Sequence, residues 1–585
     1  MKTVLDQFLQ SVERYPQHDC LLENLGQGYH ALSYTEVHRR VVNLSAALIA
    51  QGIHRGDRVA ILSENRLAWT LTDLAILHAG AIVVTLSTKL IENEDLLSRL
   101  QNSGAETIFV SASQRDRIMG LKDKTSLRRV ICFDDADFDA LEAEGSRYLA
   151  APTGDTPEQR NAATQADDPA VIIYTSGTTG NPKGVVLTHR NNVAHAEKHR
   201  PLGDYNDKSC TLALLPLDHC LFHSFFYMAM ANGASIAMPQ QGRNPLETML
   251  NMTKNIQETH PDILVLVPAM LQGFKLMLHQ KGIAQDPQRT LEFFGGRLRY
   301  LIAGGALTDP ETERFFLNLG LPIHIGYGMT EATAGVSRSY PGQHRTGTVG
   351  RPASLNQEVL IVDEEGNECA ANTSGEILYR GETVMQGYWQ NPEATREVLT
   401  ADGWFHTGDM GHLDDDGFLY IDGRVKSLLI SNSGEKYSPE GIESTLIEAC
   451  PLIQQIMLYN QQSPCTIALI VPRREALAQA IAPLSLDTTE GQDAAITLLQ
   501  QAIATYRKGG ALAGTFPDIW LPATFALLHD PFSVENGQLT ATQKLARHKV
   551  AKAYSERIAS LFTPAGMNPH NDANRNAIRG VSLHR

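Results

Sequence analysis

The sequence lacks the features that mark several classes of protein. None of its 585 residues lies in an apolar run approaching the ~18 residues that a membrane-spanning helix needs. Acidic residues outnumber basic ones, and the net charge of −15 argues against a nucleic-acid partner. The segment 1–9 carries an early acid and no continuous apolar core, so we expect no signal peptide. We therefore expect a cytoplasmic protein, with peripheral contact to a membrane left open.

Cysteine is scarce, and no two cysteines form a Cys-x-x-Cys pair. The chain contains seven cysteines at scattered positions: Cys20, Cys132, Cys210, Cys220, Cys369, Cys450 and Cys465. An odd, scattered set argues against a disulfide framework and against a cysteine-based zinc site. We interpret these side chains as reduced thiols in a cytosolic protein.

Length and composition predict a globular protein with more than one core. A chain of 585 residues is too long for one hydrophobic core, and 43% hydrophobic with 20% charged residues is typical of globular proteins. Short apolar runs alternate with helical patterns: strands are expected at 59–62, 81–84, 107–110 and 130–133, and helices at 34–52 and 68–79. This alternation predicts an α/β fold with parallel sheets flanked by helices. The polar stretch 151–168 is expected to be a surface linker.

A glycine-rich segment, Tyr174 to Gly184, stands between two apolar runs that are expected to be strands. It contains three glycines, four hydroxyl residues and Lys183. Such a loop can direct backbone N–H groups and hydroxyls at a polyanion, while the lysine supplies charge. It is not a Walker A loop, because the spacing of its glycines and lysine differs. We interpret it as a phosphate-binding loop, and a flexible surface hairpin is the alternative.

This segment resembles the signature loop of the adenylate-forming superfamily. That superfamily includes acyl-CoA synthetases, aryl-CoA ligases, adenylation domains of peptide synthetases and beetle luciferases. Two further stretches, Leu-Ser-Tyr-Thr-Glu at 32–36 and Gly-Asp-Arg-Val-Ala-Ile at 56–61, resemble the family's N-terminal pattern. The resemblance implies that the loop holds the phosphates of ATP through Thr175, Ser176, Gly177, Thr178, Thr179, Gly180 and Lys183.

A histidine pair follows the run Leu214 to Leu217. His219 and His223 are four residues apart, so they would share one face of a helix. We do not expect a metal site there, because no Glu follows the first His as in H-E-x-x-H and no third ligand is evident. The resemblance implies that His219 lies beside the acyl substrate and the α-phosphate. A hydrogen-bonded core histidine at a helix start is the alternative.

Two adjacent glycines follow an expected strand that begins at Tyr300. Because glycine has no side chain, Gly304 and Gly305 let the backbone approach a flat ligand closely. The resemblance implies that these glycines and Ala306 pack against adenine. A turn with no ligand is the alternative.

The segment 326–331, Gly-Tyr-Gly-Met-Thr-Glu, places an aromatic ring, a hydroxyl and a carboxylate on one turn after a strand. An aromatic ring can stack on a base, a hydroxyl can donate to a phosphate, and carboxylate oxygens suit Mg²⁺. The resemblance implies that Thr330 contacts the α-phosphate and that Glu331 binds Mg²⁺. It also implies that the adenine is flanked by Gly326, Tyr327 and Gly328. A helix N-terminus with a capping threonine is the alternative, and both interpretations are compatible.

From Gly375 onward the chain is rich in expected strands and turns. Two charged residues stand there among glycines and aromatics: Asp409 ends Gly-Trp-Phe-His-Thr-Gly-Asp, and Arg424 ends Tyr-Ile-Asp-Gly-Arg. They resemble the family's ribose pair. The resemblance implies that Asp409 accepts from the two ribose hydroxyls and that Arg424 donates to them. Taken singly, each would be a surface charge.

Past Arg424 the resemblance implies a second, mobile domain. Lys426 is the implied hinge, although Ser427 stands where the family often has Asp or Glu. Gly434, in Ser-Gly-Glu-Lys-Tyr-Ser-Pro, is implied to border a thiol channel that a side chain would block. Lys544, in Asn-Gly-Gln-Leu-Thr-Ala-Thr-Gln-Lys, falls on the position of the lysine that completes adenylation. A plain surface lysine is the alternative there.

These positions predict the domain organisation. We expect a large N-terminal AMP-binding domain at 1–424, built of several subdomains with parallel-type sheets, flanking helices and a β-rich part. A small, mobile α+β domain is expected at 425–562. The polar residues 563–585 are expected to form a flexible tail.

The resemblance implies a two-step reaction that uses ATP, Mg²⁺ and CoA. A carboxylate attacks the α-phosphate of ATP to give acyl-AMP and pyrophosphate, and a thiol then attacks the acyl carbonyl and releases AMP. The stretches around Gly434 and Lys544 look most like the long-chain branch, so the leading hypothesis is a fatty acid–CoA ligase for acids of medium to long chain. The implied catalytic residues are Lys544, Glu331, Thr330 and His219.

Three alternatives stay open. An acyl-AMP ligase would pass the acyl group to a carrier protein in place of CoA. A luciferase-like oxygenase uses the same first step, but no sequence feature favours it. A non-catalytic binding module is disfavoured by the presence of Lys183, Glu331, Asp409, Arg424 and Lys544. A homodimer is also left open.

Overall fold

The chain divides into two compact units. The structure is a computed structural model, and it describes residues 2–24, 26–90, 92–175, 182–200, 205–240, 242, 245–340, 342–352, 357–433, 435–540 and 544–579. The first unit comprises Met1–Ile361, Leu378–Thr407 and Leu413–Tyr420, and the second comprises Val362–Ile377, Gly408–His412 and Ile421–Arg585. The domain boundary expected after residue 424 stays a prediction.

One sheet of the first unit contains the strands on both sides of the glycine-rich loop. Its order is β18 (Gly387–Tyr388), β8 (Lys183–Thr188), β7 (Pro169–Thr175), β4 (Ile82–Leu86), β3 (Arg58–Leu62), β5 (Thr107–Val110) and β6 (Arg129–Cys132). The strands from β7 to β6 are parallel, whereas β7 and β8 form an antiparallel pair. The four strands predicted before residue 150 are confirmed to within two residues. Their apolar runs are buried because helices cover the sheet.

A second sheet of the first unit has a parallel centre. Its order is β15 (Arg351–Pro352), β14 (Ser337–Arg338), β13 (Ile323–Tyr327), β12 (Tyr300–Ala303), β11 (Ile263–Leu266), β9 (Cys210–Leu212), β10 (Ser235–Met238), β1 (Asp19–Asn24) and β2 (Tyr29–Ser33). The strands from β13 to β1 are parallel, and both edges end in antiparallel pairs. Consequently the segments that follow β9, β11, β12 and β13 leave the sheet at one edge, where α/β proteins bind ligands.

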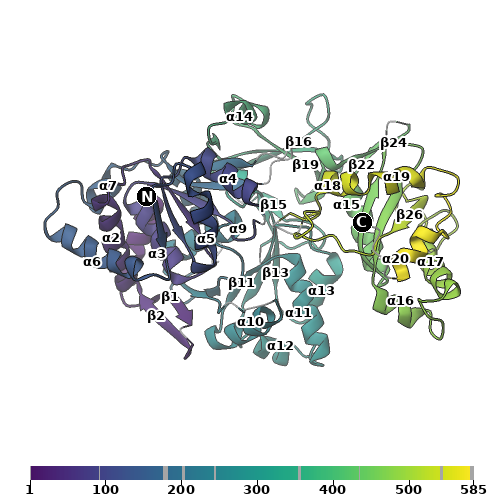
Figure 1. Cartoon of the computed structure of the whole chain (residues 1–585), viewed down its shortest axis with the longest axis horizontal. Coiled ribbons are helices and arrows are strands. Elements are labelled where there is room, and N and C mark those ends of the chain that lie inside the picture. The colour runs from purple at the N-terminus through teal and green to yellow at the C-terminus, as the bar shows by residue number, and fades with distance from the viewer. Residues whose placement is uncertain are drawn as a thin grey trace. The chain divides into compact units, whose positions relative to one another are not determined.

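Helices flank both sheets, as predicted. They are α1 (Val4–Arg14), α2 (Tyr34–Ala50), α3 (Leu67–His78), α4 (Asn93–Ser103), α5 (Ala112–Leu121), α6 (Ala136–Ala150), α7 (Pro157–Ala163), α8 (His189–His199), α9 (Cys220–Ala231), α10 (Pro245–Thr259), α11 (Pro268–Gln280), α12 (Pro287–Phe293), α13 (Pro310–Asn318) and α14 (Pro392–Val398), with short 3-10 turns η1 (Lys122–Lys124) and η3 (Thr330–Ala332). In Figure 1, α11 and α13 lie side by side. The start of α2 is set by a capping box between Ser33 and Glu36.

The stretch expected to be a linker contains a helix. Residues 157–163 form α7, whose first turn is capped reciprocally by Thr156 and Gln159. Arg160 of this helix is buried, and its Nε lies 2.8 Å from Oδ2 of Asp155. Composition alone suggested a loop, because the short helix carries few apolar residues.

A sheet of strands from the later part of the chain has the order β16 (Glu358–Val362), β17 (Gly375–Arg380), β19 (Phe405–Leu413) and β20 (Leu419–Arg424). The second unit also contains two smaller sheets, β22 (Lys436–Tyr437), β21 (Leu429–Ser431) and β24 (Gln461–Ser463), and β23 (Ile453–Tyr459), β25 (Ile467–Pro472) and β26 (Thr524–Leu527). Its helices are α15 (Pro439–Ala449), α16 (Arg474–Ala480), α17 (Thr489–Ala504), α18 (Arg547–Ala553), α19 (Ser555–Leu561) and α20 (Asp572–Arg579), with the turn η4 (Val425–Ser427). This mixture agrees with the α+β character expected for the C-terminal part.

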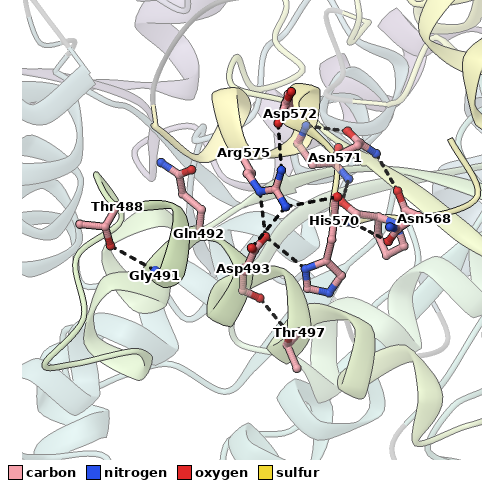
Figure 2. A network of polar contacts seen from close by, with 12 residues as sticks. Thr488, Gly491, Gln492, Asp493, Thr497, Asn568, His570, Asn571, Asp572 and Arg575 are labelled. Atoms are coloured by element: carbon pink, nitrogen blue, oxygen red, sulfur yellow. Dashed lines mark hydrogen bonds and ion pairs between the residues drawn. The ribbon is translucent and has the colours of Figure 1, made fainter. Parts of the chain in front are cut away.

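The expectation of a flexible tail is wrong for residues 563–579. Residues 572–579 form α20, which packs against α17 and β26. Asn574 is fully buried: its Oδ1 accepts a hydrogen bond from Leu527 N at 2.8 Å, and its Nδ2 donates to Phe525 O at 3.1 Å. Arg575 forms an ion pair with Asp493 of α17 (Figure 2). The segment is polar because its contacts are hydrogen bonds and ion pairs, which a composition argument mistakes for disorder.

Among the described residues, every helix is too short or too polar to cross a lipid bilayer.

Candidate functional site

Two of the glycine turns meet at the carboxyl edge of the second sheet. β12 and β13 are parallel neighbours, so the turns that follow them leave the sheet side by side. Gly305 adopts φ +85°, a conformation that favours glycine. At Gly328 a Cβ atom would lie 2.2 Å from the carbonyl oxygen of Ala334, so only glycine fits there. Glycine is therefore favoured at 305 by the backbone conformation and at 328 by the close backbone of Ala334.

His219 begins α9, in the connection that follows β9. It is the N-cap of α9, and its Nδ1 accepts a hydrogen bond from Leu221 N at 3.2 Å. The alternative is therefore confirmed as to the hydrogen bond and the helix start, but His219 is half-buried and not a core residue. His223 has a different environment: its Nε2 lies 3.1 Å from Oδ1 of buried Asp73, and Tyr227 donates to the other carboxylate oxygen at 2.9 Å. His219 therefore caps a helix, whereas His223 belongs to a buried cluster with Asp73 and Tyr227.

A cavity of about 50 Å³ lies at this edge of the sheet. The predicted site residues that line it are His219, Gly304, Gly305, Gly326, Gly328 and Thr330. Ala306 is exposed and outside the lining, and Tyr327 and Glu331 are half-buried beside it in sequence. The fold thus brings segments near residues 219, 304 and 328 around one hollow.

Thr330 does not cap a helix. It is the first residue of the short turn η3, whose N-cap is Met329 without a side-chain cap. The hydroxyl residue is buried and lines the cavity. The capping interpretation is wrong because the backbone turns back after three residues, at Thr333 and Ala334, which both adopt positive φ.

Lys183, Tyr388 and Glu331 form a chain of contacts. Lys183 Nζ lies 4.7 Å from the centre of the Tyr388 ring, a cation–π arrangement. The Tyr388 hydroxyl donates to Oε1 of Glu331 at 2.9 Å. Burial, and then the negative charge of Glu331, raise the pKa of Tyr388, so the hydroxyl keeps its proton and stays a donor. The lysine of the first motif is thereby connected to the carboxylate of the second.

The glycine-rich loop connects two paired strands. Thr175 at the end of β7 pairs with Lys183 at the start of β8, which confirms the strands on both sides of the loop. The other implied phosphate-binding residues lie outside the described residues: Ser176, Gly177, Thr178, Thr179 and Gly180.

The second unit contains the implied ribose pair. Asp409 of β19 and Arg424 at the end of β20 lie on neighbouring strands, and Arg424 Nε is 2.8 Å from Oδ1 of Asp409. Asp409 is buried, whereas the Arg424 side chain is 46% exposed. An exposed guanidinium beside a buried carboxylate can present donors to a ligand while the acid holds its orientation.

Three further implied residues belong to the second unit, and the structure describes two of them. Lys426 is the central residue of η4. Lys544 is exposed, and hydrogen bonds between its backbone and Thr540 close its turn. Gly434 lies outside the described residues, between β21 and β22.

Sequence reasoning missed two parts of this site. Tyr388 belongs to no motif identified in the sequence, yet it contacts Glu331. A second omission is the cluster His195, Lys198 and His199, which lines the same cavity. Its signal was present, because positions i, i+3 and i+4 of one helix share a face.

Comparison with known proteins identifies the family. The AMP-binding enzyme family matches residues 8–389, well over half of the chain. The chain belongs to the AMP-binding enzyme family. This membership confirms the resemblance drawn from the glycine-rich loop.

Relatives of this AMP-binding enzyme match along most of their length. The long-chain-fatty-acid–CoA ligase FadD15 of Mycobacterium bovis is 29% identical over 575 residues, which cover 88% of this chain and 89% of the relative. A crystal structure of the anthranilate CoA ligase AuaEII with anthranoyl-AMP has a TM-score of 0.76 at 20% identity and covers 95% of this chain and 98% of its own. O-succinylbenzoate coenzyme A synthetase (MenE) of Bacillus subtilis with ATP and magnesium has a TM-score of 0.71 at 22% identity, covering 94% and 99%. These structures show that the fold is the adenylate-forming one.

Proposed function

We propose that this AMP-binding enzyme converts a fatty acid of medium to long chain to acyl-AMP and then transfers the acyl group to the thiol of CoA. The observation that carries the proposal is the cavity where His219, the Gly304 turn and Thr330 meet, next to the Lys183–Tyr388–Glu331 contacts. Family membership and the name of the Mycobacterium bovis relative support the choice of substrate and acceptor.

The first step joins two anions, so the protein must supply positive charge and orientation. A carboxylate approaches the α-phosphate of ATP, the new bond forms between its oxygen and that phosphorus, and pyrophosphate leaves. Lys183 lies at the end of the glycine-rich loop and would neutralise the departing phosphates. Thr330 and Lys544 would donate to the α-phosphate, and His219 would orient the carboxylate beside it. Such positioning supplies much of the rate without a covalent enzyme intermediate.

Glu331 suits a magnesium ion. A single carboxylate, oriented by the Tyr388 hydroxyl, is a typical protein contribution, since Mg²⁺ takes its remaining ligands from phosphates and water. When bound, the ion would neutralise phosphate charge. The protein's own part is to hold the Glu331 carboxylate in place, which Tyr388 and the hydrogen bond from Met385 N to Glu331 O accomplish.

The nucleotide's ribose is assigned to the second unit. Asp409 would accept from the ribose hydroxyls, and Arg424 would donate to them. The adenine would lie against the backbone of Gly304, Gly305 and Ala306, with Tyr327 on its other side. The glycine at 305 supports this, because its turn cannot carry a side chain without strain.

The second step needs a thiol at the carbonyl in place of Lys544. A rotation at Lys426 would withdraw Lys544 and bring forward the turn that contains Gly434. The thiolate of CoA then attacks the acyl carbonyl, and the bond to AMP breaks. We assign the reaction to the cytoplasm, with no residue assigned here to a membrane, a carrier protein or a second subunit.

A pyrophosphate-release screen across carboxylic acids, run with and without CoA, tests this function. We expect aliphatic acids of medium to long chain to exceed acetate and benzoate in kcat/KM, and thioester to form with CoA. A better kcat/KM for an aryl acid would overturn the substrate class. Pyrophosphate release with thioester formed only on an added carrier protein would overturn CoA as acceptor.

A further inference from the structure

A largely buried ion pair of the second unit lies three residues after Lys544. Arg547 begins α18, and its guanidinium donates to both carboxylate oxygens of Glu443 in α15: Nη1 lies 2.9 Å from Oε1, and Nη2 donates to Oε2. The Arg547 side chain is 19% exposed and that of Glu443 is 9% exposed. Two parallel hydrogen bonds between planar groups fix direction as well as distance, so this ion pair sets where α18 begins relative to α15.

Both partners of the ion pair also contact β23. Leu458 of this strand is buried, and its N–H donates to Oε1 of Glu443 at 2.6 Å. Arg547 Nη1 donates to the carbonyl oxygen of Leu458 at 3.3 Å, and Arg547 Nε lies 3.6 Å from Oε1 of Glu440. The acid therefore holds the arginine against a core strand of the second unit. Replacing one partner would remove the paired hydrogen bonds and leave the other charge largely buried.

The backbone connects this ion pair to Lys544. Ala546, which precedes Arg547, is buried, and its N–H donates to the carbonyl oxygen of Gln538 at 2.9 Å. The carbonyl oxygen of Lys544 accepts a hydrogen bond from Thr540 N at 2.8 Å. The segment is thus held by backbone hydrogen bonds at its start and by the ion pair at its end. Because the Lys544 side chain is exposed, its direction depends on the backbone that carries it.

We propose that Glu443 and Arg547 are positioning residues for the first step, because they hold the backbone of Lys544 where its ammonium can donate to the α-phosphate. The inference rests on the proposed function, which assigns Lys544 to acyl-AMP formation. A donor stabilises developing charge only at the right distance and angle, and a misplacement of about 1 Å can cost on the order of 10²-fold in rate. The ion pair therefore acts in acyl-AMP formation and not in thioester formation, in which Lys544 takes no part.

Arg547→Met and Glu443→Gln test the ion pair in the full chain. Acyl-AMP formation is measured by pyrophosphate exchange with ATP, Mg²⁺ and dodecanoic acid, and thioester formation by adding CoA to synthetic dodecanoyl-AMP. We expect kcat of the first step to fall on the order of 10- to 100-fold in each variant. The KM for ATP should change little, since other residues bind the nucleotide. Thioester formation should stay within about threefold of wild type, because an interaction absent from its transition state cannot stabilise it.

A double variant separates positioning from stability. Glu443→Leu combined with Arg547→Met replaces the ion pair by apolar side chains, a change that often leaves stability unchanged or raises it. We expect its Tm to be at least that of the single variants, whereas acyl-AMP formation should stay slow because the directional contact is gone. Arg557→Met is the matched control. Arg557 is a partly buried arginine of α19 that donates to Asn574, and its loss should lower Tm without changing the ratio of the two rates.

Two outcomes would overturn the inference, and they differ in what else they overturn. If the double variant forms acyl-AMP at the wild-type rate, or if Arg547→Met slows both steps equally, Glu443 and Arg547 are only structural. The proposed function then stands, provided that Lys544→Ala still slows the first step alone. If Lys544→Ala forms acyl-AMP at the wild-type rate, the role that the proposed function gives to Lys544 fails, and the inference fails with it.

Discussion

The two units hold their implied site residues in different ways. In the first unit, the Gly304 and Gly328 turns follow neighbouring parallel strands; Gly305 has a positive φ, and the backbone of Ala334 leaves no room for a Cβ at Gly328. In the second, Lys544 is exposed, and its backbone is hydrogen-bonded to Thr540. A site built on strand ends keeps its shape when one side chain changes, whereas an exposed turn contributes mainly the charge that it carries. We therefore expect that substitutions can remove the charge needed for the first step without abolishing ligand binding.

Lys544→Ala is expected to have the largest effect. Adenylate formation should fall on the order of 10²- to 10³-fold, because one donor to the developing charge is lost. Conversion of supplied acyl-adenylate to thioester should persist, since an interaction absent from that transition state cannot stabilise it. Pyrophosphate exchange and thioester formation measure the two steps. Lys549→Ala is the control, because Lys549 is another exposed lysine of the second unit. Equal loss of both steps in Lys544→Ala would contradict a role of Lys544 in the first step alone.

Gly434→Leu should give the opposite pattern. A side chain beside the thiol's path should slow thioester formation by about 10²-fold, because a misplaced nucleophile loses orientation. Adenylate formation should change little. The same two assays measure it, with Gly441→Ala as control, since a Cβ at Gly441 meets no neighbour within 4 Å. If Gly434→Leu slowed adenylate formation more than thioester formation, Gly434 would act in the first step.

Glu331→Gln tests whether a side chain of the first unit also contributes to the first step. We expect adenylation to fall about 10- to 100-fold and the Mg²⁺ titration to shift to higher concentration, because an amide oxygen binds the ion less well. Tyr388→Phe should have a smaller effect of the same kind, since it only releases the Glu331 carboxylate from its donor. A Mg²⁺ titration equal to wild type in Glu331→Gln would show that the acid is structural.

Lys198→Met should stabilise the first unit by about 1–4 kcal/mol, because it removes a desolvated ammonium. The folded pKa of Lys198 is about 7, below its ordinary value. Above pH 7, up to the ordinary pKa of lysine, the unfolded chain therefore binds more protons at Lys198 than the folded chain does. The free energy of unfolding of the wild-type protein rises with pH over that range. The advantage of the variant should be largest below pH 7 and should shrink toward pH 10. His195, His199 and Arg338 face Lys198 and are present in both proteins. The measurement is therefore the difference between wild type and variant in the free energy of unfolding, obtained with a denaturant at each pH. A constant difference across pH would contradict a titrating Lys198.

Two substitutions in α20 should have the smallest effects. Asn574→Ala removes buried hydrogen bonds to β26 and should destabilise the second unit by about 1–3 kcal/mol. Arg575→Ala breaks a partly exposed ion pair with Asp493 and should cost about 0–1 kcal/mol. Thermal unfolding measures both. Equal, negligible effects would restore the interpretation of this segment as a flexible tail.

Much of the architecture could be predicted, and the failures share a cause. Apolar runs of four or five residues located β3, β4, β5 and β6 because strands buried on both faces have few alternatives. Polar segments were misjudged: α7 begins with a capping box, α20 is held by an ion pair and a buried asparagine, and neither device leaves an apolar pattern. The positions of the glycine turns were predicted, and their roles stay proposals.

The sequence by itself determined the family, the order of the motifs and the strands that position them, because these depend on local pattern and on residue types such as glycine that few alternatives replace. Only the tertiary structure decided which distant side chains meet. Tyr388 reaches Glu331 because β18 pairs with β8, and Lys198 approaches Gly335 because α8 lies against the segment before β14. Such encounters depend on sheet order and helix packing, which no local spacing encodes.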